Sequence, residues 1–184
     1  LVGLAAVFTL GPRLLHRAPS PRLGRFTLLP PGSLEQGNAL GGNAIISPDG
    51  RIVVMAASDS TGTPHLYLRP LDQLTPRVLP GTEGAYYPFW SPDCRALGFF
   101  ADGKLKRTNL DGGRPQALCD ASAGRGAAWN REGDILFSPN AQAPLFRVSS
   151  NGGVARPLTT LDAATKEFAH RWPQFLPDGR HFLY

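Results

Sequence analysis

A turn-and-strand pattern recurs four times in this chain of 184 residues. The four copies begin at positions 46, 90, 129 and 175 and read ISPDGRIVVMA, WSPDCRALGFF, WNREGDILFS and FLPDGRHFLY. Their starts are 44, 39 and 46 residues apart. A period of roughly 40–45 residues is typical of the four-stranded blades of β-propellers and also of paired-helix repeats, so the spacing narrows the fold to two architectures.

The composition of the units decides between these two architectures. Their apolar stretches, such as IVVMA, LGFFA and ILFS, are short, rich in aromatic and β-branched residues, and bounded by Gly, Pro, Asn and Asp, which is typical of strands. Beyond residue 16, no stretch keeps the apolar spacing of an amphipathic helix over three turns. The 21 Gly and 18 Pro are spread along the chain, as many tight turns require. The repeats therefore predict an all-β fold.

Each unit divides into four predicted strands. In the second unit, the strands read YPFWS, RALGFFA, KLKRTNL and RPQAL. Pro92-Asp93 fits a β-turn and Asp102-Gly103 fits a two-residue hairpin. The fourth unit stops after its second strand, at Tyr184. We therefore expect residues 25–184 to form a partial β-propeller of about three and a half four-stranded antiparallel blades.

Bulky side chains recur at one position of the unit. A single blade buries little surface, so every blade needs the same inward-facing side chains to stack on its neighbour. Ile46 is a smaller member of this set. The predicted inter-blade packing residues are Trp90, Trp129 and Phe175.

Aspartates mark the turns of the repeat. An Asp side chain in a turn accepts hydrogen bonds from backbone amides a few residues further on, so a structural role is favoured over a catalytic one. The third unit carries Glu132-Gly133 at this place, which we interpret as a weaker version of the same turn. The predicted structural turn residues are Asp49, Asp93, Asp111 and Asp178.

The first 24 residues differ from the repeats. Residues 1–15 begin with LVGLAAVFTL, and ten residues cannot cross a bilayer, which needs about 20. We predict that residues 1–15 are the end of a truncated transmembrane helix, in a piece of a longer polypeptide. A signal-peptide core and a buried strand are the alternatives. Residues 16–24 are predicted to be a linker, because Pro19 and Pro21 favour extended backbone.

The net charge of +5 does not indicate a nucleic-acid partner. Four arginines precede the first acidic residue, and without them 15 basic and 14 acidic residues remain. The repeat region is thus nearly neutral and lacks the basic surface that phosphate backbones require. The four are Arg13, Arg17, Arg22 and Arg25.

No catalytic pattern is found in the sequence. There is no G-x-S-x-G elbow, no H-E-x-x-H, no phosphate-binding loop and no EF-hand spacing. We therefore expect no catalytic, cofactor-binding or metal-binding residue and no enzymatic activity in this chain. Four histidines, isolated in sequence, are interpreted as strand or loop residues: His16, His65, His170 and His181.

Three further groups received a structural interpretation. Tyr86-Tyr87 with Pro88 precedes the first strand of the second unit, where core packing is favoured over ligand contact. A basic cluster in the next hairpin is interpreted as a solvated face. Cys94 and Cys119 have no metal or disulfide spacing and leave the redox state open. The basic cluster is Lys104, Lys106 and Arg107.

The repeats resemble a known family. ISPDGR, WSPDCR and FLPDGR, each followed by an apolar strand, together with LDGG or SNGG and then RPL, resemble TolB-like propeller repeats over residues 43–184. The N-terminal segment with RFTLLPPG, GAAWNREGDILFSP and HRWPQFLPDGRHFLY also resembles the extracytoplasmic half of bacterial membrane-anchored Ser/Thr protein kinases. No kinase motif occurs in this chain, so no kinase residue carries over.

The resemblance implies a place and a role. It implies a single-pass protein of the bacterial cell membrane whose extracytoplasmic propeller acts as a sensor or scaffold, binding an unidentified protein or small molecule at its face. The alternatives are the gating propeller of a prolyl-oligopeptidase-type hydrolase and a TolB-like periplasmic envelope protein. The sequence leaves open the ligand, the blade number, the membrane orientation and any attached catalytic domain.

Overall fold

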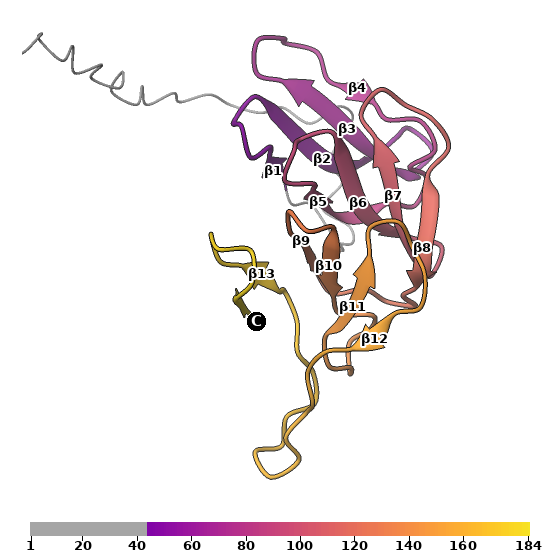
Figure 1. The fold of residues 1–184 in the computed structure, drawn as a ribbon. Coiled ribbons are helices and arrows are strands. Elements are labelled where there is room, and N and C mark those ends of the chain that lie inside the picture. The colour runs from indigo at the N-terminus through magenta and orange to yellow at the C-terminus, as the bar shows by residue number, and fades with distance from the viewer. Residues whose placement is uncertain (1–43) are drawn as a thin grey trace, which may run out of the picture.

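The computed structural model describes residues 44–184 (Figure 1). The predictions for residues 1–15, 16–24 and the start of the repeat region lie outside the described residues. Within the described part of the chain, no helix is long and apolar enough to cross a membrane.

Fourteen strands lie in residues 44–184, and most are short. Their bounds are β1 (Ile45–Ile46), β2 (Ile52–Ser58), β3 (Pro64–Pro70), β4 (Arg77–Val78), β5 (Tyr86–Trp90), β6 (Ala96–Ala101), β7 (Lys104–Asn109), β8 (Gln116–Asp120), β9 (Ala127–Trp129), β10 (Asp134–Phe137), β11 (Phe146–Ser149), β12 (Arg156–Pro157), β13 (Gln174–Phe175) and β14 (Phe182–Leu183).

The strands form three four-stranded sheets and one hairpin. Each sheet is an antiparallel meander in chain order, β1 to β4, β5 to β8 and β9 to β12, and β13 pairs with β14. Figure 1 shows the sheets following one another in chain order, with β13 beside the third sheet. The prediction of three blades and the first two strands of a fourth is confirmed. We call the sheets blades one to three and β13–β14 the fourth hairpin.

Local chemistry fixes the hairpins. Asp102 and Gly103 connect β6 to β7 with φ of 53° and 68°, so both central residues lie in the left-handed region that a type I′ turn requires. The turn sets the register in which Ala101 faces Lys104 and Ala96 faces Asn109. All six residues of β6 are buried, because this strand has a blade on each side.

Two apolar layers join the blades. The first lies between blades one and two, where Leu66 and Leu68 meet Trp90, Leu97 and Phe99. Because side chains alternate along a strand, Phe89 and Phe100 point to the opposite face. That face forms the second layer, against blade three. Its buried members are Phe89, Phe100, Leu105, Leu118, Ala121, Ile135, Phe137 and Val148.

One glycine is required by this packing. Gly98 faces Phe89 across β5 and β6, and a Cβ at Gly98 would lie 2.0 Å from Cζ of Phe89. No carbon contact of that length is possible, so the Phe89 ring occupies the space that a side chain would need. The absence of a side chain at Gly98 lets Phe89 reach the layer that joins blades two and three.

Two of the three predicted packing residues lie at these layers. Trp90 belongs to the first layer and Trp129 packs against the second. Phe175 lies against Phe182 in the fourth hairpin, with ring centroids 6.4 Å apart. Ile46, expected to be a smaller member of the set, is 54% exposed, because it lies on the face of blade one turned away from blade two.

Candidate binding site

In blades one and two, the turn between the first two strands is built around a hydroxyl and a carboxylate. In blade one, Ser47 donates its hydroxyl to Asp49 at 2.6 Å, and the N–H of Arg51 donates to the same carboxylate at 3.1 Å. The Ser47 hydroxyl in turn accepts the N–H of Ile52 at 2.9 Å. The hydrogen bonds to Asp49, that from the Ser47 hydroxyl first and then that from the N–H of Arg51, lower the pKa of Asp49.

Blade two repeats the arrangement with the same residue types. Ser91 donates to Asp93 at 2.7 Å and accepts the N–H of Ala96 at 2.9 Å. The pKa of Asp93 is lowered, first by this hydroxyl and then by the N–H of Arg95. The repeated S-P-D motif therefore closes the turn and connects it to the start of the second strand.

The other turns differ in detail. Asp178 accepts the N–H groups of Arg180 and His181, both at 3.0 Å, and its second oxygen lies 2.6 Å from Nδ1 of His181. In blade three, Asn130 takes the part of the serine and accepts the N–H of Asp134 at 2.8 Å. Asp111 follows β7, and its carboxylate makes no hydrogen bond within residues 44–184.

In blade three, Glu132 stands at the position of the turn aspartate, but its side chain makes no turn hydrogen bond among the described residues. Instead, Asn130 also donates its side-chain N–H to the carbonyl of Gly179 at 3.1 Å. The turn of blade three is therefore connected directly to the turn of the fourth hairpin.

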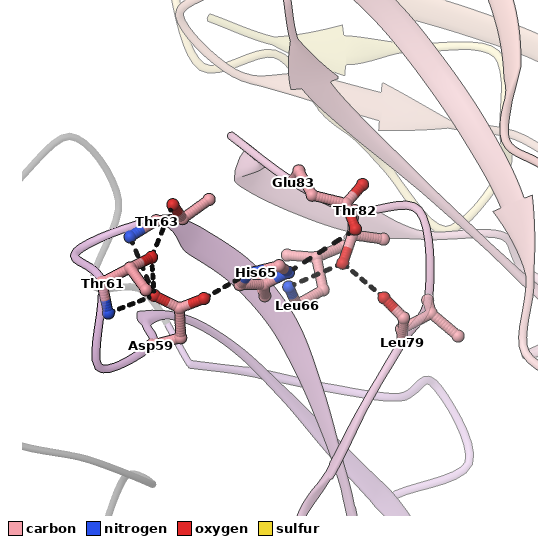
Figure 2. A network of polar contacts seen from close by, with 8 residues as sticks. All are labelled: Asp59, Thr61, Thr63, His65, Leu66, Leu79, Thr82 and Glu83. Carbon is pink, nitrogen blue, oxygen red and sulfur yellow. Dashed lines mark hydrogen bonds and ion pairs between the residues drawn. The ribbon is translucent and has the colours of Figure 1, made fainter.

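The opposite end of the blades carries a second set of polar contacts, which Figure 2 shows for blade one. Thr82 donates to the carbonyl of Leu79 at 2.6 Å and accepts the N–H of Leu66 at 3.0 Å. His65 lies between two carboxylates, with Nε2 3.0 Å from Asp59 and Nδ1 4.0 Å from Glu83. The hydroxyl and N–H of Thr61 lower the pKa of Asp59 to about 2.

Blade three repeats this device. Thr159 accepts the N–H of Leu145 at 2.9 Å, and its hydroxyl lies 2.8 Å from Nδ1 of the buried His170. Nε2 of His170 lies 3.1 Å from Glu167. The three histidines in the described part of the chain thus each contact a carboxylate and hold a loop, while His16 lies outside it.

The side chains of the basic cluster each contact another residue of the fold. Lys104 pairs with Asp120 at 2.7 Å, and Lys106 pairs with Asp102. Arg107 reaches blade three, with its guanidinium 5.6 Å from the centre of the Trp129 ring. Cys94 and Cys119 are free thiols, and burial raises the pKa of Cys119 to about 11. A thiol with so high a pKa is a poor nucleophile at neutral pH.

The first strands of the blades and the turns that follow them line an open cavity of about 790 Å³. β5 contacts both β2 and β9, and β9 contacts β13, so the first strands of blades two and three and of the fourth hairpin lie next to one another. Residues from all four units line this space, which we call the axial cavity. Its size is typical of small-molecule sites.

Two aromatic residues reach the axial cavity from strained backbone. Tyr87 and Trp172 have φ of 47° and 55°, in the left-handed region that bulky residues rarely adopt. Their rings meet edge to face with centroids 4.7 Å apart. The register of β5 slips between Tyr86 and Phe89, which marks a bulge, and bulges redirect side chains next to binding sites.

Gly126 stands at the equivalent place in blade three. Its φ is 90°, and a Cβ there would lie 2.5 Å from Cε3 of Trp172. The N–H of Trp172 donates to the carbonyl of Arg125 at 3.1 Å. Blade three therefore has no side chain at this position, and the indole of Trp172 packs against its backbone. Trp172 remains 49% exposed.

The sequence interpretation does not identify this site. For Tyr87 it favours core packing over ligand contact, and it assigns no site role to Trp172, Gly126 or Arg131. The signal was available, because YP before FW, GA before AW and WP before QF align in the repeat. Nothing in one sequence shows that the aligned backbone is left-handed.

Within the described residues, no group of three or more His, Cys, Asp or Glu could hold a metal ion. Two further cavities lie between blades: one of about 340 Å³ beside the fourth hairpin and one of about 470 Å³ beside Lys104 and Cys119. The axial cavity is the space around which aromatic side chains from several blades gather. It is therefore the candidate binding site.

The fold is that of a TolB-like propeller. A TolB-type protein from Agrobacterium tumefaciens superimposes with a TM-score of 0.62 at 22% identity, covering 73% of this chain and 50% of that one. TolB from Acinetobacter baumannii gives a TM-score of 0.62 at 20% identity, covering 80% of this chain and 38% of that one. This chain spans half or less of the length of these structures. No family model and no curated protein matches the sequence.

Proposed function

We propose that this chain is a non-catalytic binding module that takes a ligand in the axial cavity. The observation that carries the proposal is the left-handed pair Tyr87 and Trp172, which place two aromatic rings at a cavity of about 790 Å³. Backbone strain of this kind costs of order 1–3 kcal/mol per residue and is concentrated at functional sites. A half-exposed Trp in such a place is a good contact surface for an apolar ligand.

The wider setting is part of the same proposal. The apolar start of the sequence and the kinase-like repeat motifs support an extracytoplasmic sensor or scaffold of a membrane-anchored protein, with a Ser/Thr kinase domain elsewhere in the polypeptide. The two TolB structures support a second candidate, a periplasmic envelope protein. The coding sequence upstream of Leu1 discriminates between them: a kinase domain followed by a complete transmembrane helix supports the first, and a cleavable signal supports the second.

Binding at the axial cavity is testable with neutral aromatic probes. We expect indole and naphthalene-1-carboxamide to shift the backbone NMR signals of residues 86–90, 126–131 and 172–175 and few others. Trp172→Ala should weaken binding of both probes several-fold, because stacking on the indole is lost. The matched control is Phe168→Ala, which removes an aromatic that is 66% exposed and does not line the cavity.

Two results would count against the binding-module proposal. One is an absence of shifts from either probe up to their solubility limits. The other is a scatter of shifts over the surface that responds equally to Trp172→Ala and Phe168→Ala.

A further inference from the structure

Most of the residues that line the axial cavity are uncharged. Five of its lining residues are aromatic residues of the first strands, and three others are prolines of the turns. Of the described residues, one with a charged side chain lines it, Arg131. Within residues 44–184, the guanidinium of Arg131 makes no hydrogen bond or ion pair. An apolar cavity with one free cation at its wall is complementary to an apolar ligand with one negative charge.

Arg131 also departs from the repeat. It occupies the second position of its turn, where the other three units carry Pro48, Pro92 and Pro177. All three prolines line the same cavity, so the four positions form a set of equivalent places around it. A proline at this position presets the turn. Blade three lacks this proline and carries the guanidinium of Arg131 at the same position.

The aromatic walls set the shape of the ligand. Trp172 offers an exposed indole, and Tyr87 packs edge to face against it. Trp129, from the strand that precedes Arg131, lies on the same cavity wall. Aromatic rings stack on one another, and this stacking stabilises the complex beyond the effect of the buried apolar area. The cavity therefore favours a planar aromatic body over a flexible aliphatic one.

From these observations we infer that the axial cavity selects a small aromatic carboxylic acid, whose ring stacks against Trp172 and whose carboxylate pairs with Arg131. This inference rests on the proposed function and adds the chemical class of the ligand. The guanidinium presents two parallel N–H donors that match a carboxylate. Arg131 would also repel a cationic ligand, which the aromatic rings alone would accept.

Three probes with one naphthyl ring isolate the charge: 1-naphthaleneacetate, 1-naphthaleneacetamide and 1-naphthylmethylamine. We expect the acetate to bind about tenfold tighter than the amide and the amine to bind weakest, as measured by NMR titration of the 184-residue chain. In Arg131→Met the acetate should fall to the affinity of the amide, and in Arg131→Lys it should recover in part. The matched control is Arg114→Met, an exposed arginine outside the cavity.

The possible results separate the two proposals. Equal binding of acetate and amide, or an acetate affinity unchanged by Arg131→Met, would overturn the inference while leaving the binding module in place. If none of the three probes bound, both would fail. Unchanged near-ultraviolet circular dichroism of Arg131→Met shows that any loss of affinity is not a loss of fold.

Discussion

At the scale of single residues, the turn serines matter as much as the aspartates. The side chain of Ser91 is the acceptor for the N–H of Ala96, and both residues are buried. Ser91 also holds Asp93 by donating to it. The Ser91 hydroxyl therefore accepts the buried N–H of Ala96 and orients the Asp93 carboxylate, which accepts the backbone N–H of Arg95.

We predict that Ser91→Ala destabilises the fold by about 1–3 kcal/mol, because the N–H of Ala96 is left buried without an acceptor. The free energy of unfolding, measured by urea denaturation, tests this. Ser60→Ala, in an exposed loop, is the control and should change stability by less than about 0.5 kcal/mol. A loss of stability no larger than that of the control would show that the hydroxyl is dispensable.

At the scale of elements, the turn of the fourth hairpin contains an ion pair between two exposed side chains. Asp178 and His181 face each other at 2.6 Å, and each shifts the pKa of the other. Hydrogen bonds, that from His181 first, lower the pKa of Asp178, while Asp178 raises the pKa of His181 above its ordinary 6.5. The histidine contribution is therefore complete below pH 6.5 and is lost as the pH rises through the higher pKa of the folded state. The aspartate contribution is lost only in strong acid.

We predict that the hairpin β13–β14 is more stable at pH 5.5 than at pH 8.5. Hydrogen exchange of the amides of Arg180 and His181, corrected for the intrinsic effect of pH, should show greater protection at pH 5.5. His181→Gln should remove the difference. A pH dependence that persists in this variant would show that the Asp178–His181 pair is not its cause.

The elements were largely predictable from sequence, and the site was not. Alternation of apolar residues between Gly, Pro and Asp turns placed the strands of all four units, because those residues act locally. Trp90 and Trp129 were recognisable as packing residues because the repeat imposes the same burial on each blade. The bond from Asn130 to the carbonyl of Gly179 and the pairing of Tyr87 with Trp172 are contacts between units of the repeat, which no local pattern records.

At the scale of the whole molecule, the blades act together. Each apolar layer is shared by two blades, and this packing holds the first strands side by side. Residues of these strands and of the turns after them line the axial cavity. The strained residues Tyr87 and Trp172 are 85 positions apart in sequence and belong to different units. Their rings meet only if the blades are arranged around one axis. The binding proposal and the choice of an aromatic acid both depend on this arrangement.

The most direct measurement of this arrangement is the nuclear Overhauser effect between the ring protons of Tyr87 and Trp172. The account predicts strong cross-peaks between the two rings, whose centroids lie 4.7 Å apart. Tyr67, which does not line the axial cavity, should show no cross-peak to Trp172. If the sheets form with their assigned registers but the Tyr87 and Trp172 rings show no contact, the radial arrangement and the site built on it are wrong.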